Sequence, residues 1–336
     1  MDINTLRDLE SRGFVVVRDF LSGEELDALR ADYATRPMDQ NGNYNARTPT
    51  STAIASFAER IDDVVRQVRE QTSIRADVHV PTTSNYFTVG VADGVYFPWH
   101  QDHESYYVLQ NHFDYLNFYL PIIKPELHKS NLCVVPFDVL AEAAPNIHDF
   151  VVRSGAGFFR PVAGRTVAIN EDRGAARIAH VDLEALAVTP HLAAGDLLLM
   201  RGDIVHRTQD TDTARVALSW RVANGNTVIR RDRLASGCRQ KAVMMRKHTE
   251  PYRQLFQAFE LAGRDALTLR DVLDLYETMP PAEPVDLDEF DRQLSAERRR
   301  AHALPGYLAS YPLTYALKGL NKAQQTSSRV KQLVGN

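Results

Sequence analysis

The sequence predicts a mainly β protein with flanking helices, in which a double-sheet jelly-roll core of the cupin kind carries a C-terminal helical extension. Between about residues 74 and 228 the chain is a succession of short apolar segments separated by turn residues. Helical patterns precede and follow this region without interrupting it, whereas a parallel α/β sheet would need helices between its strands. A chain of 336 residues also exceeds the usual size of one domain. We therefore expect the core over residues 1–228 and the extension, packed on the core or on a partner subunit, over residues 229–336.

The N-terminal region is predicted to place helices around one short strand. Residues 13–17 form a β-branched run, and Ser22 and Glu25 fit a capping box that opens a helix. Residues 39–49 are rich in Asn and Gly and lack periodicity, which predicts a surface loop or a flap over a site. A second helix is expected over residues 53–70. The strands of the core are therefore expected to follow this region.

Short strands dominate the middle of the chain. They are expected at residues 84–91, 95–100, 115–123, 132–135, 166–170, 196–201 and 214–222. After about residue 227 the strand pattern ends, and helices are expected over residues 252–262 and 269–279. Two prolines at 280 and 281 separate them from a strongly charged stretch at 288–302. The extension is therefore expected to be helical, and a homo-oligomer would form through it.

Composition and charge exclude several classes of protein. Hydrophobic residues make up 44% of the chain and charged residues 24%, as in an ordinary soluble globular protein. The net charge of −4 argues against nucleic acid as a partner. The N-terminus lacks a signal-peptide pattern and no stretch approaches the ~18 apolar residues of a membrane span, so a cytoplasmic location without a membrane partner is expected. Cys133 and Cys238 are too few for a disulfide framework and are expected to be reduced thiols.

The segment Trp99-His100-Gln101-Asp102, taken with a later histidine, carries the chemistry of a metal site. Residues two apart on a strand point to the same face, so His100 and Asp102 can reach one metal ion. His206 follows the apolar run at residues 195–201, which could return it to the same end of the core. Two imidazoles and one carboxylate are the donor set of mononuclear iron(II) sites. These three residues are therefore the candidate ligands and the candidate catalytic centre.

A His-x-Asp pattern is weak evidence by itself. The chain contains two further copies, His112-Phe113-Asp114 and His180-Val181-Asp182. The first copy lies in a polar turn and the second in a region where a surface position is expected. Neither copy has the support that the later apolar run and His206 give to His100 and Asp102, so we do not expect them to bind metal.

Arg215 is the candidate anchor for a carboxylate. It begins a predicted strand nine residues after His206. One face of that strand carries Arg215, Ala217, Ser219 and Arg221. This face suits a polar interior, where a guanidinium would hold a carboxylate through two hydrogen bonds. The alternative for Arg215 is a surface ion pair with Asp210 or Asp212, and Arg221 is a second candidate for the same task or for a carboxylate of the substrate.

These residues resemble the iron(II)- and 2-oxoglutarate-dependent dioxygenases, and within them the phytanoyl-CoA dioxygenase family that includes ectoine hydroxylase. The opening at residues 13–22 is also similar to the start of that family, and the resemblance covers about residues 8–225. It implies a double-stranded β-helix, which is another name for the jelly roll. It further implies that His100, Asp102 and His206 bind iron(II), that Arg215 binds the distal carboxylate of 2-oxoglutarate, and that O2 is the oxidant.

Three further residues fall where members of the family place polar contacts to 2-oxoglutarate, namely Asn85, Asn117 and Thr208. Each could instead satisfy backbone groups of the core. The chain departs from the family at residues 135–138, where many members have Pro-Gly-Ser-His and this chain has Val-Pro-Phe-Asp. The last hundred residues or so have no counterpart in the resemblance. The identity of the substrate is therefore not inherited.

The side chains expected to line the substrate cavity are Glu104, Tyr106, Tyr115, Tyr119 and Arg221. A polar and aromatic lining suits a small polar metabolite, such as an amino-acid derivative or a natural-product intermediate. The alternative is that the tyrosines belong to the core. The resemblance implies hydroxylation with release of succinate and CO2, because related halogenases have Ala or Gly in place of Asp102. Desaturation or ring formation by the same chemistry, a metal-dependent isomerase of the cupin kind, and a non-enzymatic binding protein remain as alternatives.

Overall fold

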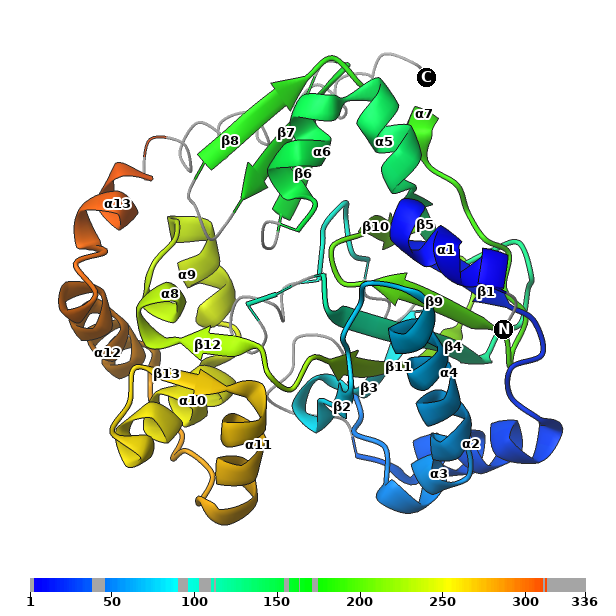
Figure 1. Ribbon diagram of the computed structural model, residues 1–336, viewed down its shortest axis with the longest axis horizontal. Coiled ribbons are helices and arrows are strands. Elements are labelled where there is room, and N and C mark those ends of the chain that lie inside the picture. The colour runs from blue at the N-terminus through cyan, green and yellow to red at the C-terminus, as the bar shows by residue number, and fades with distance from the viewer. Residues whose placement is uncertain are drawn as a thin grey trace, which may run out of the picture.

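The chain is described from a computed structural model, which covers residues 3–37, 46–89, 96–102, 110–111, 113–153, 157–162, 164–170, 175–310 and 312. Figure 1 shows three groups of elements. Antiparallel strands with the N-terminal helices form one group, a small sheet with α5 and α6 forms the second, and the C-terminal helices form the third. Glu104 and Tyr106, and residues 39–45 of the predicted loop, lie outside the described residues.

The N-terminal region contains a strand among helices, as expected. Its elements are α1 (Ile3–Ser11), β1 (Phe14–Val17), α2 (Gly23–Thr35), α3 (Ser51–Ala55) and α4 (Ala58–Gln71). Ser22 and Glu25 form the predicted capping box of α2. The single helix expected over residues 53–70 is instead divided between α3 and α4. Phe57 causes the break, because its buried ring packs edge-on against Trp220, 6.2 Å away.

The central sheet has the strand order β1-β9-β4-β11-β2, with β3 also paired to β11. Its strands are β2 (Val78–His79), β3 (Asn85–Val89), β4 (Tyr115–Ile123), β9 (Leu197–Arg201) and β11 (Arg215–Ala223). A smaller pair joins β5 (Leu132–Val135) to β10 (Val205–Thr208). Every pairing among these strands is antiparallel. A strand-rich antiparallel core flanked by helices is therefore confirmed, and its closure as a jelly roll stays a prediction.

The two faces of β11 have different environments. Val216, Leu218 and Trp220 are buried in an apolar cluster with residues of α2 and α4, which cover this side of the sheet. Arg215 and Arg221 lie on the opposite face. The alternation predicted for this strand thus separates an apolar layer from a polar interior.

The expectation that helices would not interrupt the strands is wrong. Between β5 and β9 lie α5 (Phe137–Ala143), α6 (Pro145–Val151), β6 (Gly157–Val162), β7 (Arg165–Asn170), β8 (Ala175–Ala179) and α7 (Leu183–Leu186). The helices in this insertion have seven residues or fewer, too few for a helical period to stand out. Prolines at 136 and 145 mark the start of α5 and of α6. The insertion nevertheless has its own antiparallel sheet, so the argument against a parallel fold holds.

The segment expected as a strand at residues 95–100 is also different. Among residues 96–100 only His100 makes bridges, one to Phe158 and one to His206. Pro98 explains the difference, because it has no N–H to donate to a ladder of backbone hydrogen bonds. Phe97 instead donates its backbone N–H to the hydroxyl of Thr208 at 3.2 Å.

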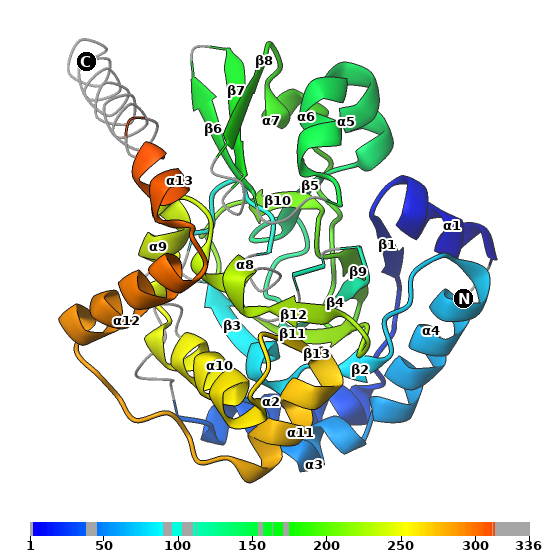
Figure 2. The ribbon, with the colours of Figure 1, turned by 60° about the vertical axis from the view of Figure 1, so that its left-hand side comes forward.

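The C-terminal extension is mostly helical but contains a strand pair that the sequence did not indicate. Its elements are β12 (Val228–Arg230), α8 (Arg231–Ala235), α9 (Arg239–Met245), α10 (Thr249–Ala262), β13 (Ala266–Thr268), α11 (Leu269–Thr278), α12 (Leu287–Arg300) and α13 (Leu304–Ala309). The two strands have three residues each and lie far apart in sequence, so no alternation reveals them. Figure 2 shows the helices of the extension beside this pair. Tyr115 and Phe158 share an apolar cluster with Tyr252 and Phe256, so the extension packs on the rest of the chain. None of the described helices is long and apolar enough to cross a membrane.

A buried ion pair fixes the turn between β9 and β10. The Arg201 guanidinium donates two hydrogen bonds to Asp203, at 3.0 and 2.6 Å, and lies between the rings of Phe113 and Phe137. Both charged side chains are almost fully buried. Since this turn leads into β10 and His206, the pair anchors one end of the strand that carries a candidate ligand.

Replacing Arg201 with leucine should destabilise the fold severely. The change leaves the Asp203 carboxylate buried without its cation, which typically costs about 3–5 kcal/mol. The expected result is a lower midpoint of unfolding in urea with an unchanged slope. Arg66→Ala, which removes an exposed ion-paired arginine of α4, is the control and should leave the midpoint unchanged. Equal midpoints for both variants would contradict the assignment of Arg201 as an anchor.

Candidate metal centre

The structure brings His100, Asp102 and His206 together. One ligand atom from each lies within 4.8 Å of the other two, and all three side chains are buried. The Nε2 atom of His206 is 3.6 Å from the Oδ1 atom of Asp102, and the two imidazole rings are 4.3 Å apart between centroids. Among the described residues this is the one cluster of three such groups. The three predicted ligands can therefore converge on a single ion.

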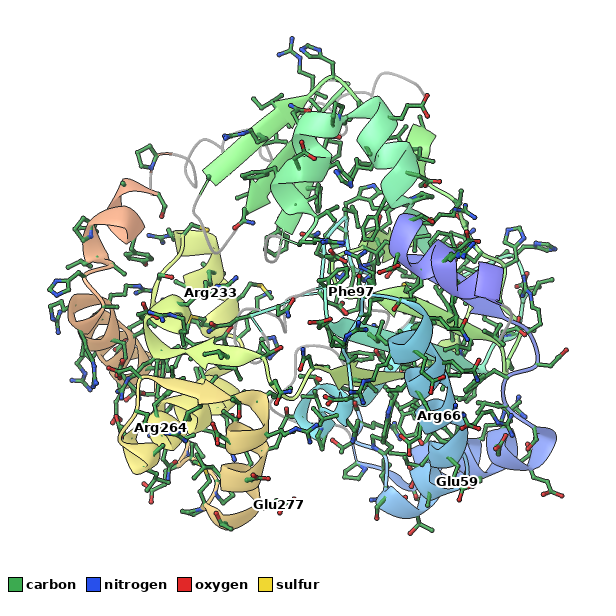
Figure 3. The ribbon with its side chains drawn as sticks, in the orientation of Figure 1. Glu59, Arg66, Phe97, Arg233, Arg264 and Glu277 are labelled. Atoms are coloured by element: carbon green, nitrogen blue, oxygen red, sulfur yellow. The ribbon has the colours of Figure 1, made fainter. Side chains whose placement is uncertain are left out.

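Backbone pairing sets the relative position of the two histidines. His100 and His206 exchange backbone hydrogen bonds, each of 2.9 Å, so the segment after Pro98 and strand β10 run side by side. Gln101 lies between the two ligands of the His-x-Asp motif and its side chain points elsewhere. It donates to the backbone carbonyl of Asp203 at 2.6 Å, which ties the motif to the turn before β10. Phe97, labelled in Figure 3, stacks against His100 at 5.7 Å.

Hydrogen bonds to the backbone fix the tautomer of both imidazoles. The Nδ1 atom of His100 lies 2.7 Å from the carbonyl oxygen of Pro98, and that of His206 lies 3.0 Å from the carbonyl oxygen of Ile204. A carbonyl accepts only, so each Nδ1 carries a proton, and in the neutral imidazole the lone pair is then on Nε2. Neutral imidazoles with the lone pair on Nε2 are the form that binds a metal. This is the chemical evidence that the residues fit an ion.

The two carboxylate oxygens of Asp102 face different neighbours. Its Oδ2 atom accepts a hydrogen bond of 3.3 Å from Asn117 and lies 3.8 Å from Nε of Arg221, while Oδ1 faces His206. Ser219 in turn donates to Asn117 at 2.6 Å. Asn117 thus contacts a candidate ligand directly, and the contact with 2-oxoglutarate that the resemblance implied stays a prediction. The Oδ1 atom thus lies on the side of the carboxylate where the His206 imidazole is, within reach of an ion that His206 would bind.

Arg221 lies deep in the structure, 5% exposed. Besides Asp102, it donates through its guanidinium to the carbonyl oxygen of Thr83 and through its backbone N–H to the Ser84 hydroxyl. These contacts come from the turn before β3, far from Arg221 in sequence. They hold Arg221 in place, and its guanidinium, 3.8 Å from Asp102, offsets the charge of that carboxylate. Its predicted contact with a substrate stays a prediction.

Arg215 is buried at the start of β11. It is 2% exposed, which excludes the alternative of a surface ion pair, and its Nη1 donates to the carbonyl oxygen of Ser130 at 3.0 Å. Asp210 accepts hydrogen bonds from Ser130. The guanidinium lies 5.4 Å from the ring of Tyr119, and its Nε makes no hydrogen bond within the described part of the chain. A buried cation with unused donor capacity fits an anionic ligand.

The charge of Arg215 affects the pKa of two neighbouring side chains, Tyr119 and Lys124. Burial raises the pKa of Tyr119, and the Arg215 charge opposes that rise. Burial also lowers the pKa of Lys124 to about 8, and the repulsion from Arg215 adds to this effect. Lys124 follows the end of β4, so two cations lie at this end of the polar face. A dicarboxylate such as 2-oxoglutarate would relieve their repulsion.

The remaining predicted residues make separate contacts with their own surroundings. Asn85 on β3 pairs in register with Ser219, and its side-chain oxygen accepts from Thr48 at 3.2 Å. Thr208 is fully buried and holds Phe97 through backbone and hydroxyl contacts. Thr208 thus satisfies backbone groups of Phe97, and its predicted contact with 2-oxoglutarate stays a prediction. Tyr115 is buried against the C-terminal extension, as expected for a core aromatic.

The aspartates of the two other His-x-Asp copies have structural roles, and His112 lies outside the described residues. Asp114 accepts a hydrogen bond from the side chain of Asn224, which joins the start of β4 to the end of β11, and another from the backbone N–H of Arg75, in the segment between α4 and β2. Asp182 caps the N-terminus of α7. The carbonyls of Pro98 and Ile204, by contrast, contribute to the candidate centre without any signal in the sequence, because a backbone group is the same at every residue.

Residues 9–217 match the model of a protein family, which is described as Phytanoyl-CoA dioxygenase (PhyH). The chain belongs to this family. Its match ends near the start of the C-terminal extension, in line with the resemblance over about residues 8–225. Together with the His-Asp-His cluster, family membership supports the class of non-haem iron(II)- and 2-oxoglutarate-dependent oxygenases. No curated protein matches the chain.

Solved structures of oxygenases are similar to the chain. EctD from S. alaskensis, with 2-oxoglutarate and 5-hydroxyectoine, is 17% identical, with 68% of this chain and 78% of that chain covered and a TM-score of 0.44. The carbocyclase SnoK from nogalamycin biosynthesis is 14% identical, with coverage of 67% and 85% and a TM-score of 0.44. HygX from Streptomyces hygroscopicus, with nickel, 2-oxoglutarate and hygromycin B bound, is 14% identical, with coverage of 66% and 87% and a TM-score of 0.41.

Proposed function

We propose that this protein uses iron(II), 2-oxoglutarate and O2 to hydroxylate an unactivated C–H bond of a small polar metabolite, with release of succinate and CO2. The observation that carries the proposal is the convergence of His100, Asp102 and His206 with both imidazoles held in the metal-binding tautomer. Two histidines and one carboxylate would hold iron(II), which would then bind a chelating keto acid and O2.

The protein's own groups would divide the work in four ways. His100 and His206 present Nε2, and Asp102 presents one oxygen while Asn117 holds the other. Arg215 binds the distal carboxylate of 2-oxoglutarate and so orients the keto acid. Iron and 2-oxoglutarate, when bound, supply the activation of O2. Burial of all three ligands excludes bulk water from the reactive centre.

The proposed substrate class rests on the lining of the polar face. Tyr119 and Asn85 flank Ser219 on the neighbouring strands, and Phe87 lies 5.6 Å from the Arg221 guanidinium. Aromatic and amide side chains of this kind suit an amino-acid derivative or a natural-product intermediate better than a long acyl chain. Desaturation or ring formation would use the same residues, and analysis of the product distinguishes these outcomes from hydroxylation. We place the reaction in the cytoplasm, with a homo-oligomer, if it forms, assembled through the C-terminal helices.

Anaerobic titration of the purified protein with iron(II) and then 2-oxoglutarate tests the proposal. The expected result is a weak visible charge-transfer band that needs both components and that Arg215→Ala diminishes. Metal binding without a band would favour the alternative of a metal-dependent isomerase, which has no use for Arg215. Failure to bind metal would favour a non-enzymatic binding protein.

A further inference from the structure

Two residues adjacent to the candidate ligands lie side by side on the face turned away from the metal centre. Trp99 precedes His100 and Arg207 follows His206. Because the two histidines are paired through their backbones, Trp99 and Arg207 are neighbours across the strands. Alternate residues point to opposite sides, so these two side chains face away from the metal centre. They are therefore in a position to fix the two ligand-bearing segments relative to each other.

Glu184 contacts both of these residues. Its Oε1 atom accepts hydrogen bonds of 2.9 Å from Nε1 of Trp99 and of 2.9 Å from Nε of Arg207. Its Oε2 atom accepts a third, of 2.6 Å, from Nη2 of Arg207. Glu184 belongs to α7, whose first turn is capped by Asp182. One carboxylate of the insertion thus joins the segment of His100 to the strand of His206, and we call the three residues Trp99, Glu184 and Arg207 the Glu184 bridge.

The surroundings give the Glu184 bridge a rigid base. Trp99 is 4% exposed. Its ring packs with Cys133 and Val135 of β5 and Val205 of β10, in an apolar cluster that also contains residues of the insertion. The Arg207 guanidinium lies 5.2 Å from that ring and also donates to the backbone carbonyls of Thr208 and Gln209. Its side chain is 14% exposed, so water screens its contact with Glu184 only in part. The paired charges and the indole N–H therefore form a defined geometry rather than a loose surface contact.

We propose that Glu184 is a positioning residue of the metal centre, acting through Trp99 and Arg207 to hold His100 and His206 at the separation that one ion requires. The proposal rests on the proposed function only in taking these histidines as metal ligands. It also assigns a role to the insertion between β5 and β9, because α7 of that insertion supplies the Glu184 carboxylate. The physical reason is that metal affinity depends on ligands being held in place before the ion arrives.

Replacing Glu184 with alanine should weaken metal binding about tenfold, the lower end of the effect of groups that orient metal ligands. Glu184→Gln, which keeps an acceptor for Trp99 and loses the charge opposite Arg207, should give an intermediate effect. Asp232→Asn is the matched control. Asp232 holds Arg230 through two hydrogen bonds, as Glu184 holds Arg207, and the two carboxylate side chains are 50% and 51% exposed. Asp232 lies in the C-terminal extension and does not contact the ligand-bearing segments in the described structure.

The measurement is anaerobic titration with Mn(II), followed by electron paramagnetic resonance, together with the thermal midpoint at each metal concentration. The alanine variant should show a raised dissociation constant and a smaller rise of the midpoint on adding Mn(II), because stabilisation by a ligand follows its affinity. The control variant should match the wild type in both. Wild-type affinity in Glu184→Ala, or an equal loss in the control, would overturn the proposal.

A separate measurement decides the proposed function. If the wild type binds Mn(II) but gives no charge-transfer band with iron(II) and 2-oxoglutarate, the oxygenase assignment fails. The comparison of Mn(II) affinities among the variants would then still support or overturn the positioning role by itself.

Discussion

Asp102→Ala is expected to abolish hydroxylation and to weaken iron binding. The change removes the only carboxylate of the cluster and leaves two neutral imidazoles to hold a dication. Because a correctly bound metal contributes several kcal/mol to the stabilisation of a transition state, the loss of turnover should be about 10³-fold or more. Succinate release measures turnover, and an anaerobic titration measures the affinity for iron(II).

The surroundings of Asp102 sharpen this expectation. Arg221 lies 3.8 Å from the carboxylate and remains buried in the variant, where Asp102 no longer offsets its charge. The resulting positive charge repels a metal cation, which adds to the loss of the ligand. Asn117, which donates a hydrogen bond to the Oδ2 atom of Asp102 in the wild type, carries no charge and cannot replace the carboxylate as a ligand.

Asp114→Ala is the matched control, because Asp114 belongs to a second His-x-Asp sequence and lies outside the cluster. It should lower the thermal midpoint, since the hydrogen bonds of Asp114 with Arg75, Asn111 and Asn224 are lost, and leave the affinity for iron(II) near the wild-type value. Equal loss of iron binding in both variants would show that the wrong motif has been chosen.

The candidate ligands could be predicted because the relevant rules are local. The alternation of side chains places His100 and Asp102 on the same side, and it separates Arg215 and Arg221 from the apolar face of β11. The burial of the apolar residues of β11 with α2 and α4 agrees with that alternation. Strands of nine residues, such as β4 and β11, are long enough for this pattern to be clear.

The contacts that surround the ligands depend on the packing of distant segments. Arg221 meets Asp102 and Thr83 only because β11 pairs with β2, β3 and β4 in one register. Glu184 reaches Trp99 and Arg207 from a four-residue helix that has no periodic signal. The sequence thus indicates which residue types could bind a metal, whereas the groups that hold them in place are visible only in the folded chain.

Arg215→Ala should chiefly raise the concentration of 2-oxoglutarate required for turnover. Removing a buried charged partner from a hydrogen-bonded pair costs about 2–5 kcal/mol, so the Michaelis constant for 2-oxoglutarate should rise roughly 30-fold or more. The affinity for iron(II) alone should change little, because no hydrogen bond of Arg215 in the described structure reaches the three ligands. Succinate release at increasing 2-oxoglutarate, with iron saturating, measures the change.

The lysine variant separates geometry from charge. Arg215→Lys keeps a cation beside Tyr119 and Lys124 but loses the planar pair of donors, so it should restore part of the affinity without reaching the wild type. If alanine and lysine variants both retain the wild-type requirement for 2-oxoglutarate, the carboxylate is bound elsewhere. Arg221, the second buried arginine of the same face, would then be the residue to replace, and its ion pair with Asp102 predicts that iron affinity would fall together with co-substrate affinity.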